Sequence, residues 1–310
     1  MNGEPKIHIE DVYKLYDGRR VLDNVDLSVS TGEFCALVGP SGCGKSTLLR
    51  LILGQERPTR GQVLIENAPA GFPDTRRGIV FQKYTLYPHL TVLDNVLLGR
   101  RLEQPWSWLP RVQPRPRDRA AALEHLERVR LSDAAHKYPH ELSGGMQQRV
   151  AIAQALIMKP PVLLMDEPFG ALDPDTREEL QLFLLELWER EKLTIFFVTH
   201  DLEEACFLGT RLLVLSQYYT DDRGDGAQRG GKIVADYLLT DAANSTRVKR
   251  REDFKAFIQT LREQGFDPSI RRHVKDFDLQ HPDSFRTLTR EEYRLAHPQG
   301  AGLNTTGDNS

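Results

Sequence analysis

Cysteine is scarce in this chain of 310 residues, and no apolar run is long enough to cross a bilayer. The three cysteines, Cys35, Cys43 and Cys206, are scattered, so they indicate neither a disulfide framework nor a zinc module. A membrane-spanning helix needs roughly 20 consecutive apolar residues. Residues 1–6 carry no apolar segment of the kind that secretory signals contain. Together these absences predict a reduced, cytosolic protein.

A strong charge of either sign is also missing, because 41 Lys and Arg face 44 Asp and Glu for a net charge of −3. No bulk basic field points to nucleic acid, and we expect no nucleic-acid partner. Hydrophobic residues make up 40% and charged residues 27%, which are ordinary values for a globular protein. The length allows one large domain or two small ones.

Strands alternate with helices along most of the chain. Apolar alternation predicts two half-buried strands of an antiparallel N-terminal layer, around residues 7–12 and 25–29. Continuous apolar runs predict buried parallel strands, and helical spacing predicts helices between them. The other expected strands are 34–38, 62–66, 78–82, 162–165, 194–199 and 211–216, and the expected helices are 45–54, 119–130, 147–158 and 177–191. This order predicts an α/β fold with a mainly parallel sheet.

The strand 34–38 is followed by Gly-Pro-Ser-Gly-Cys-Gly-Lys-Ser, the pattern of a phosphate-binding loop. Its glycines let backbone N–H groups point at phosphates, and the helix that it opens adds a positive dipole end. We predict a nucleoside triphosphate site in which Lys45 reaches the β- and γ-phosphates and the Ser46 hydroxyl ligates Mg²⁺. An ordinary glycine-rich turn is the alternative. The predicted nucleotide-binding residues of this segment are Gly39, Pro40, Ser41, Gly42, Cys43, Gly44, Lys45, Ser46 and Thr47.

Cys43 lies inside this loop and has two interpretations. It is a small filler at a variable position, or an oxidation-sensitive thiol whose pKa is lowered by Lys45 and the helix start.

Two adjacent acids, Asp166 and Glu167, end the strand 162–165. Open α/β sheets bind ligands at the carboxyl ends of their strands. Asp166 therefore suits Mg²⁺ binding, and Glu167 can polarise the attacking water as general base. An Asp-Glu-Pro sequence alone is also a common strand-end turn, and the phosphate-binding loop upstream favours the functional interpretation.

Residues 142–149 read Leu-Ser-Gly-Gly-Met-Gln-Gln-Arg. With this string after the phosphate-binding loop, the chain resembles the ATP-binding-cassette (ABC) ATPases over about residues 5–240. The resemblance implies an enzyme that hydrolyses ATP with Mg²⁺. It also implies that Gln82 touches Mg²⁺ and senses a membrane subunit, that His200 contacts the γ-phosphate, and that Tyr16 stacks on adenine. The implied catalytic residues are Glu167, His200, Gln82 and Lys45, and the implied metal ligands are Ser46, Gln82 and Asp166.

A second copy of the chain is implied as partner. Ser143, Gly144 and Gly145 precede the helix 147–158 and offer another helix N-terminus for the γ-phosphate. In the family this part comes from the partner subunit, so two chains bind two ATP molecules head to tail as a homodimer. Residues 171–173 match the loop that links the two sites.

The resemblance also implies the domain organisation: a phosphate-loop NTPase core with an N-terminal antiparallel β layer and an inserted helical subdomain at about residues 85–160. We expect the ABC ATPase domain at 5–240 and a C-terminal extension at 241–310, partly helical and then disordered, with a polar, frayed tail from about residue 265.

Two further segments break the pattern of alternating strands and helices. Residues 100–119, rich in proline and arginine, are expected to be a solvated surface loop rather than a contact with a membrane subunit or anionic lipid, and residues 221–231 a flexible hairpin tip rather than a site.

The implied function is the ATP-hydrolysing subunit of an importer, bound at the cytoplasmic face of the inner membrane. Its expected partners are a multi-spanning permease, docked on the apolar segment 84–90, and a solute-binding protein; core packing is the alternative for that segment. Residues 163–173 and 197–205 look most like the nitrate/sulfonate/taurine group, and residues 216–219 point to the urea-carboxylase-associated branch, which handles small nitrogenous solutes.

Two other functions are weighed against the importer. A soluble ABC ATPase of DNA repair or translation is disfavoured, because the chain has one cassette and no sustained heptads within residues 46–142. A nucleotide-gated scaffold without turnover is disfavoured by the presence of Glu167 and His200.

Overall fold

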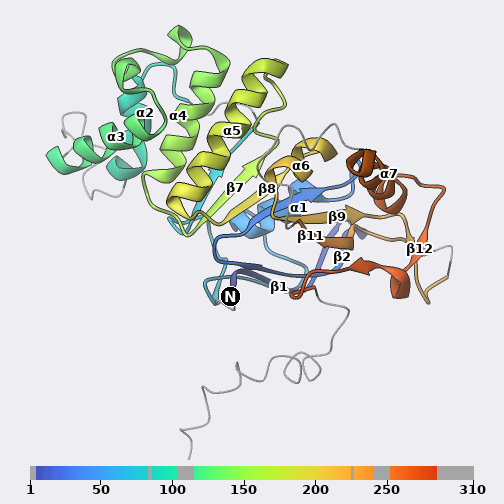
Figure 1. Cartoon of the computed structure of the whole chain (residues 1–310). Coiled ribbons are helices and arrows are strands. Elements are labelled where there is room, and N and C mark those ends of the chain that lie inside the picture. The colour runs from blue at the N-terminus through green and yellow to red at the C-terminus, as the bar shows by residue number, and fades with distance from the viewer. Residues whose placement is uncertain (1–4, 83–85, 103–114, 225–226, 240–251, 285–310) are drawn as a thin grey trace, which may run out of the picture.

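The computed structural model describes residues 5–82, 86–102, 115–224, 227–239 and 252–284. Its elements form a four-stranded, a seven-stranded and a two-stranded sheet, with helices between and beside them (Figure 1). Within these residues, no helix combines the length and the apolar character that a membrane span requires.

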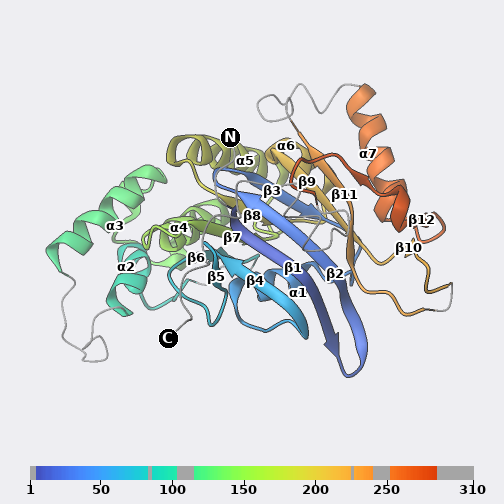
Figure 2. The same ribbon diagram turned by 90° about the horizontal axis from the view of Figure 1, so that it is seen from below.

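The N-terminal sheet is the predicted antiparallel layer, with strand order β2-β1-β4-β5. Alternate apolar side chains of its long strands, such as Ile7, Ile9 and Leu27, are buried against the rest of the core. Figure 2 shows this layer lying across one face of the molecule. Its strands are β1 Pro5–Tyr16, β2 Arg19–Ser30, β4 Arg60–Ile65 and β5 Ala68–Pro69.

The central sheet has seven strands in the order β13-β11-β9-β3-β8-β7-β6. The five strands from β9 to β6 are parallel, and β11 runs antiparallel to β9. The predicted continuous apolar runs are confirmed, because helices and the N-terminal layer cover both faces. The strands are β3 Phe34–Val38, β6 Arg77–Val80, β7 Val162–Asp166, β8 Ile195–Val198, β9 Arg211–Ser216, β11 Lys232–Leu238 and β13 Asp278–Leu279.

Helices pack on this sheet in two groups. The helix α1, Lys45–Leu53, contacts strands of both sheets and ends at Gly54, as predicted. The helices α2, α3 and α4 pack on one another as the expected helical insert, with α5 alongside (Figure 1). Sequence analysis missed α2 and α6, which are short or weakly patterned. The bounds are α2 Val92–Leu102, α3 Pro116–Arg128, α4 Gly144–Leu156, α5 Pro174–Glu191 and α6 Leu202–Leu208. Most of the predicted surface loop at 100–119, residues 103–114, lies outside the described residues.

The prediction of a frayed tail from residue 265 is wrong for residues 266–284. The helix α7, Glu252–Gly265, buries Phe254, Ile258 and Leu261 at helical spacing and packs on β9 and β11. After it, β12 (Arg272–His273) pairs with β10 (Tyr219–Thr220), and β13 pairs with β11. A few spaced apolar anchors hold this polar stretch, so its average composition was misleading. Residues 285–310 lie outside the described part, and the domain boundary at 240 stays a prediction.

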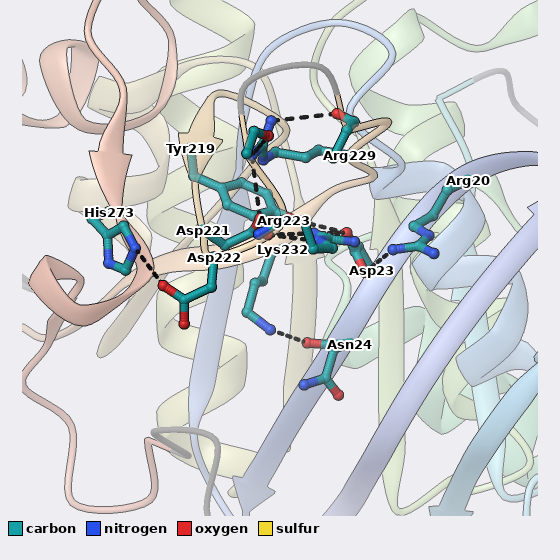
Figure 3. Close-up of polar contacts among 12 residues, drawn as sticks. Arg20, Asp23, Asn24, Tyr219, Asp221, Asp222, Arg223, Arg229, Lys232 and His273 are labelled. Carbon is teal, nitrogen blue, oxygen red and sulfur yellow. Dashed lines mark hydrogen bonds and ion pairs between the residues drawn. The ribbon is translucent and has the colours of Figure 1, made fainter.

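The prediction of a flexible hairpin tip at 221–231 is also wrong for Asp221, Arg223 and Arg229, which take part in a polar network (Figure 3). Its centre is the Asp23 carboxylate, which is 3% exposed. The carboxylate accepts hydrogen bonds from Arg20 at 2.9 Å, from the Tyr219 hydroxyl at 2.7 Å and from Arg223 at 2.6 Å. A buried carboxylate with three donors ties the hairpin to β2.

A second buried network joins the C-terminal segment to the sheet. The Arg211 guanidinium, fully buried, donates to Asp236 at 2.9 and 2.7 Å. His281 Nε2 lies 3.1 Å from Glu33 Oε1. Burial alone would raise the pKa of Glu33, but the His281 hydrogen bond and the Arg211 charge outweigh it and hold that pKa below its ordinary value.

We predict that His281→Ala lowers the free energy of unfolding at pH 7 by about 1–3 kcal/mol, because it leaves Oε1 of the half-buried Glu33 carboxylate without its His281 donor while Ser30 N still donates to Oε2. A Glu33 carboxyl whose pKa is lower in the folded than in the unfolded protein stabilises the fold at pH values above the unfolded pKa, about 4.3. This contribution to the free energy of unfolding is lost as the pH falls below that value. The gap between wild type and variant should therefore shrink at pH 4. Urea denaturation at both pH values measures it. His136→Ala, at an exposed histidine, is the control; an equal loss in both variants would contradict the prediction.

Candidate functional site

Residues far apart in the chain meet at the carboxyl edge of the parallel strands. The strand registers pair Leu37 with Val198, Val198 with Asp166, and Met165 with Val80. The segments that follow these strands therefore emerge on one edge. The predicted site residues in those segments are Gly39–Ser46, Gln82, Glu167 and His200.

The phosphate-binding loop is compact and requires its glycines. A Cβ on Gly39 would lie 2.1 Å from the Leu215 carbonyl oxygen, and Gly44 takes a φ of +105° just before α1. The Lys45 ammonium donates to the carbonyls of Gly39 at 2.6 Å and Pro40 at 3.1 Å. The ammonium and the N-terminus of α1 thus place positive charge at this loop, as phosphate binding requires.

The structure brings Glu167 and His200 together: Glu167 Oε1 lies 3.2 Å from His200 Nδ1. Glu167 has a φ of +46°, and its N–H donates to Val198 O at 2.8 Å. A non-glycine residue in this conformation is strained, and such strain is concentrated at functional sites. The turn after β7 therefore holds the Glu167 carboxylate beside the histidine that follows β8.

The oxygen donors of a divalent cation gather at the same edge. Burial and the neighbouring Glu167 charge raise the pKa of Asp166, while Lys45 acts in the opposite direction. Gln82 lies against the same turn, since a Cβ on Gly170 would be 3.0 Å from its Nε2. The Asp166 carboxylate, the Gln82 amide and the exposed hydroxyl of Ser46 offer oxygen donors of the kind that Mg²⁺ prefers.

The contacts of Tyr16 in the described part of the chain are with polar and charged side chains. Its hydroxyl donates to the Glu56 carboxylate, and Lys14 Nζ lies 4.9 Å from its ring centroid. The ring is 36% exposed, which leaves surface for a ligand. Its role in stacking stays a prediction.

The signature residues Ser143, Gly144 and Gly145 begin α4 in the helical group, apart from α1 (Figure 1). The Ser143 hydroxyl accepts the Met146 N–H at 3.3 Å as N-cap. Gly145 allows close packing on α5, since a Cβ would lie 2.6 Å from Thr176 Cγ2. Ser143 is exposed, whereas Gly144 is half-buried and Gly145 is buried, so the N-cap of α4 faces solvent.

The hypothesis of a reactive Cys43 thiol is wrong in its physical basis. Cys43 is 1% exposed within the apolar core, and burial raises its pKa even though Lys45 acts to lower it. It is the packing residue that the alternative interpretation described.

A contact that sequence analysis missed supports the phosphate-binding loop from behind. Gly231 exchanges backbone hydrogen bonds with β2, accepting from Asp23 N at 3.0 Å and donating to Val21 O at 2.8 Å. A Cβ on Gly231 would lie 1.9 Å from the Cys43 carbonyl oxygen. The Gly-Gly pair at 230–231 was a signal of close backbone approach, but it equally indicates a turn.

Comparison with known proteins finds similar chains. A family model described as "ABC transporter" matches residues 22–170. The aliphatic sulfonates import ATP-binding protein SsuB of Bacillus subtilis is 44% identical over 211 residues, 67% of this chain and 78% of that protein. The sulfate/thiosulfate import ATP-binding protein CysA of Pectobacterium atrosepticum is 35% identical over 299 residues, 95% of this chain and 85% of that protein.

A solved structure shares the fold. It is a dimeric ATP-binding cassette in a post-hydrolysis state, bound to ADP and Pi. It aligns with a TM-score of 0.60 at 34% identity, covering 75% of this chain and 98% of that one. The α/β cassette with its helical insert is therefore confirmed.

We predict that Gly231→Ala weakens ATP binding about tenfold or more, because the added methyl displaces the Cys43 carbonyl and overpacking costs about 1–3 kcal/mol. Titration with a fluorescent ATP analogue measures it. Gly224→Asn is the control in the same hairpin, since Gly224 has a left-handed φ of +82° with open space around it and Asn tolerates that conformation. Equal affinity of both variants and wild type would show that the contact does not support the loop.

Proposed function

The chain belongs to the ABC transporter family of ATP-binding proteins, and we propose that it is the ATP-hydrolysing subunit of an importer for a small solute. Its relatives are import ATP-binding proteins, and such subunits are ATPases coupled to transport. The observation that carries the proposal is the approach of Glu167 to His200 at 3.2 Å, beside the phosphate-binding loop. A carboxylate base beside this histidine suits attack by water on the terminal phosphate of a nucleotide held by Lys45 and the loop backbone.

Hydrolysis then proceeds with residues in distinct roles. The Glu167 carboxylate accepts a proton from water while the water oxygen attacks the γ-phosphorus. The bond from the γ-phosphorus to its bridging oxygen breaks, and ADP and phosphate form. His200 contacts the γ-phosphate and orients the Glu167 carboxylate, and the Lys45 ammonium stabilises negative charge on the phosphate oxygens.

The oxygen donors fit Mg²⁺, and we assign Ser46, Asp166 and Gln82 as the residues that hold it. When bound, the ion neutralises charge on the β- and γ-phosphates. Gln82 lies at the start of the segment that leads to Tyr87, so one residue links the metal site to the surface proposed below for the permease.

The permease docks on the segment around Tyr87, which is 46% exposed. Asn95, fully buried on α2, fixes this loop: its Oδ1 accepts the Tyr87 N–H at 2.8 Å, and its Nδ2 donates to the Leu90 carbonyl at 3.1 Å. Leu86 is half-buried and packs against the core, so it serves the fold as well. A rigid loop with an exposed aromatic suits docking. Residues 84 and 85 of the predicted surface lie outside the described part.

The likeness to SsuB supports the nitrate/sulfonate/taurine group, and so a sulfonate-like or small nitrogenous solute. CysA, whose name records sulfate and thiosulfate, also suits a small anionic solute. The assembly then works at the cytoplasmic face of the inner membrane, with a solute-binding protein as third component.

We predict that Glu167→Gln lowers the rate of ATP hydrolysis about 10²-fold or more, because an amide cannot take the proton of the attacking water. ATP binding should be retained. Phosphate release and nucleotide titration measure the two effects separately. Glu189→Gln, an exposed position on α5, is the matched control. An unaltered rate in Glu167→Gln would remove Glu167 as the base.

We predict that the tagged chain, purified from its native membranes in mild detergent, carries a multi-spanning permease that mass spectrometry identifies. Tyr87→Asp should lose this partner, because it puts a charge into an apolar interface. Leu238→Asp is the control, since Leu238 is equally exposed at 45% but lies at the end of β11. Ribosomal or DNA-repair proteins in place of a permease would overturn the importer and leave only the ATPase.

A further inference from the structure

His200 is not held in place by packing of its own side chain, which is 65% exposed. Its two neighbours in the chain are held instead. Thr199 is 2% exposed at the end of β8. Asp201 caps α6, because its Oδ1 accepts two N–H groups of the first turn at 2.9 and 3.1 Å. The position of His200 therefore depends on how Thr199 and Asp201 are anchored.

A buried carboxylate on α6 anchors this turn. Glu204 is 5% exposed, and its Oε2 accepts the Thr199 hydroxyl at 2.6 Å. The oxygen of that hydroxyl accepts the Asp201 N–H at 3.1 Å, which leaves its single hydrogen for Glu204. A hydroxyl that donates and accepts in this way has one orientation. Thr199 and Asp201 are thus locked on either side of His200.

The same carboxylate reaches the neighbouring helix α5. Glu204 Oε1 accepts the Gln181 Nε2–H at 2.9 Å, and Gln181 is 2% exposed. The Gln181 Oε1 has no hydrogen-bond partner in the described part of the chain. A carboxylate only accepts, so Glu204 fixes the Gln181 amide with its nitrogen inward and leaves that oxygen unpaired. Such an arrangement costs stability, which points to a function for the carboxylate.

A second contact joins α5 to the same turn. The Arg177 guanidinium lies 4.0 Å from Asp201 Oδ2 and donates to the Leu172 carbonyl at 3.1 Å. Leu172 belongs to the loop 171–173, directly before α5. The turn that carries His200 is therefore tied to the helix that this loop begins.

We propose that Glu204 is a positioning residue for hydrolysis, which holds His200 beside Glu167 through the Thr199 hydroxyl and fixes that turn on α5 through Gln181. The proposal rests on the role proposed above for His200. Glu204 lies buried behind the turn, so it acts through Thr199 and not on the nucleotide.

The test compares isosteric variants of the full-length chain. Thr199→Val replaces the hydroxyl by a methyl group and removes both of its hydrogen bonds. We expect kcat to fall at least about tenfold while affinity for ATP changes less than about threefold, because small displacements of a catalytic group slow the chemistry most. Thr199→Ser keeps the hydroxyl and should retain most of the rate. Phosphate release, nucleotide titration and thermal melting are measured for each variant.

Two variants of Glu204 separate hydrogen bonding from packing. Glu204→Leu fills the site without an acceptor and should behave as Thr199→Val. Glu204→Gln should stay near wild type, because its oxygen accepts from Thr199 and the Gln181 amide can turn so that its unpaired oxygen accepts from the new amide. A purely structural role would lower the melting temperature of Glu204→Leu and leave kcat unchanged in the folded protein, which would overturn the proposal.

A double-mutant cycle tests whether the effect passes through His200. Thr199→Val with His200→Ala should lose no more activity than His200→Ala alone. If the loss of kcat in the double variant equals the product of the losses in the two single variants, the proposal is overturned. If Thr199→Val keeps full kcat while His200→Ala loses it, the positioning role fails and the role of His200 stands. If His200→Ala itself keeps full kcat, both fail.

Discussion

Parallel pairing of β3, β8, β7 and β6 is the constraint on which the site depends. Because parallel strands end on the same edge, the phosphate-binding loop, His200, Glu167 and Gln82 meet although long segments of chain separate them. The pairing is stable because both faces of these strands are buried, with α1 and the N-terminal layer on one side and helices such as α5 on the other. The same burial leaves the polar residues no place except the strand ends. The parallel pairing of these strands thus determines both the packing of the core and the position of the candidate catalytic residues.

The C-terminal segment belongs to the same arrangement. It adds β13 beside β11 and pairs β12 with β10, at the base of the hairpin that presses Gly231 on the phosphate-binding loop. Tyr219 shows the connection in one side chain: its ring packs edge-on against Phe277 at 5.9 Å, and its hydroxyl donates to Asp23 at 2.7 Å. Residues 252–284 therefore contact the nucleotide-binding core through a short series of buried groups and are not an appendage.

Much of the fold could be predicted from sequence, because strands buried on both faces are continuous apolar runs and the long helices have clear spacing. What failed had a physical reason in each case. The segment 266–284 is anchored by a few residues such as Phe277, which average composition hides. Cys43 was judged by its closeness to Lys45 in the chain, while its burial decides its pKa. Gly231 was assigned to a turn, because the sequence alone does not distinguish a glycine in a turn from one that a close backbone contact requires. The contact between Glu167 and His200 was not predicted, since no local pattern relates two strand ends; the sequence and the family resemblance gave only a separate role to each residue.

The exposed N-terminus of α4 shows what the chain lacks by itself. Ser143 is exposed at the start of a helix whose other face packs on α5, and α5 in turn carries Gln181 and Arg177 toward the turn around His200. A related cassette is dimeric in its post-hydrolysis state, bound to ADP and Pi. In this chain Gly145 lies so close to α5 that a Cβ there would be 2.6 Å from Thr176 Cγ2. Since α5 is tied to both neighbours of His200, a series of contacts through α4 and α5 connects the signature residues to the turn that carries His200.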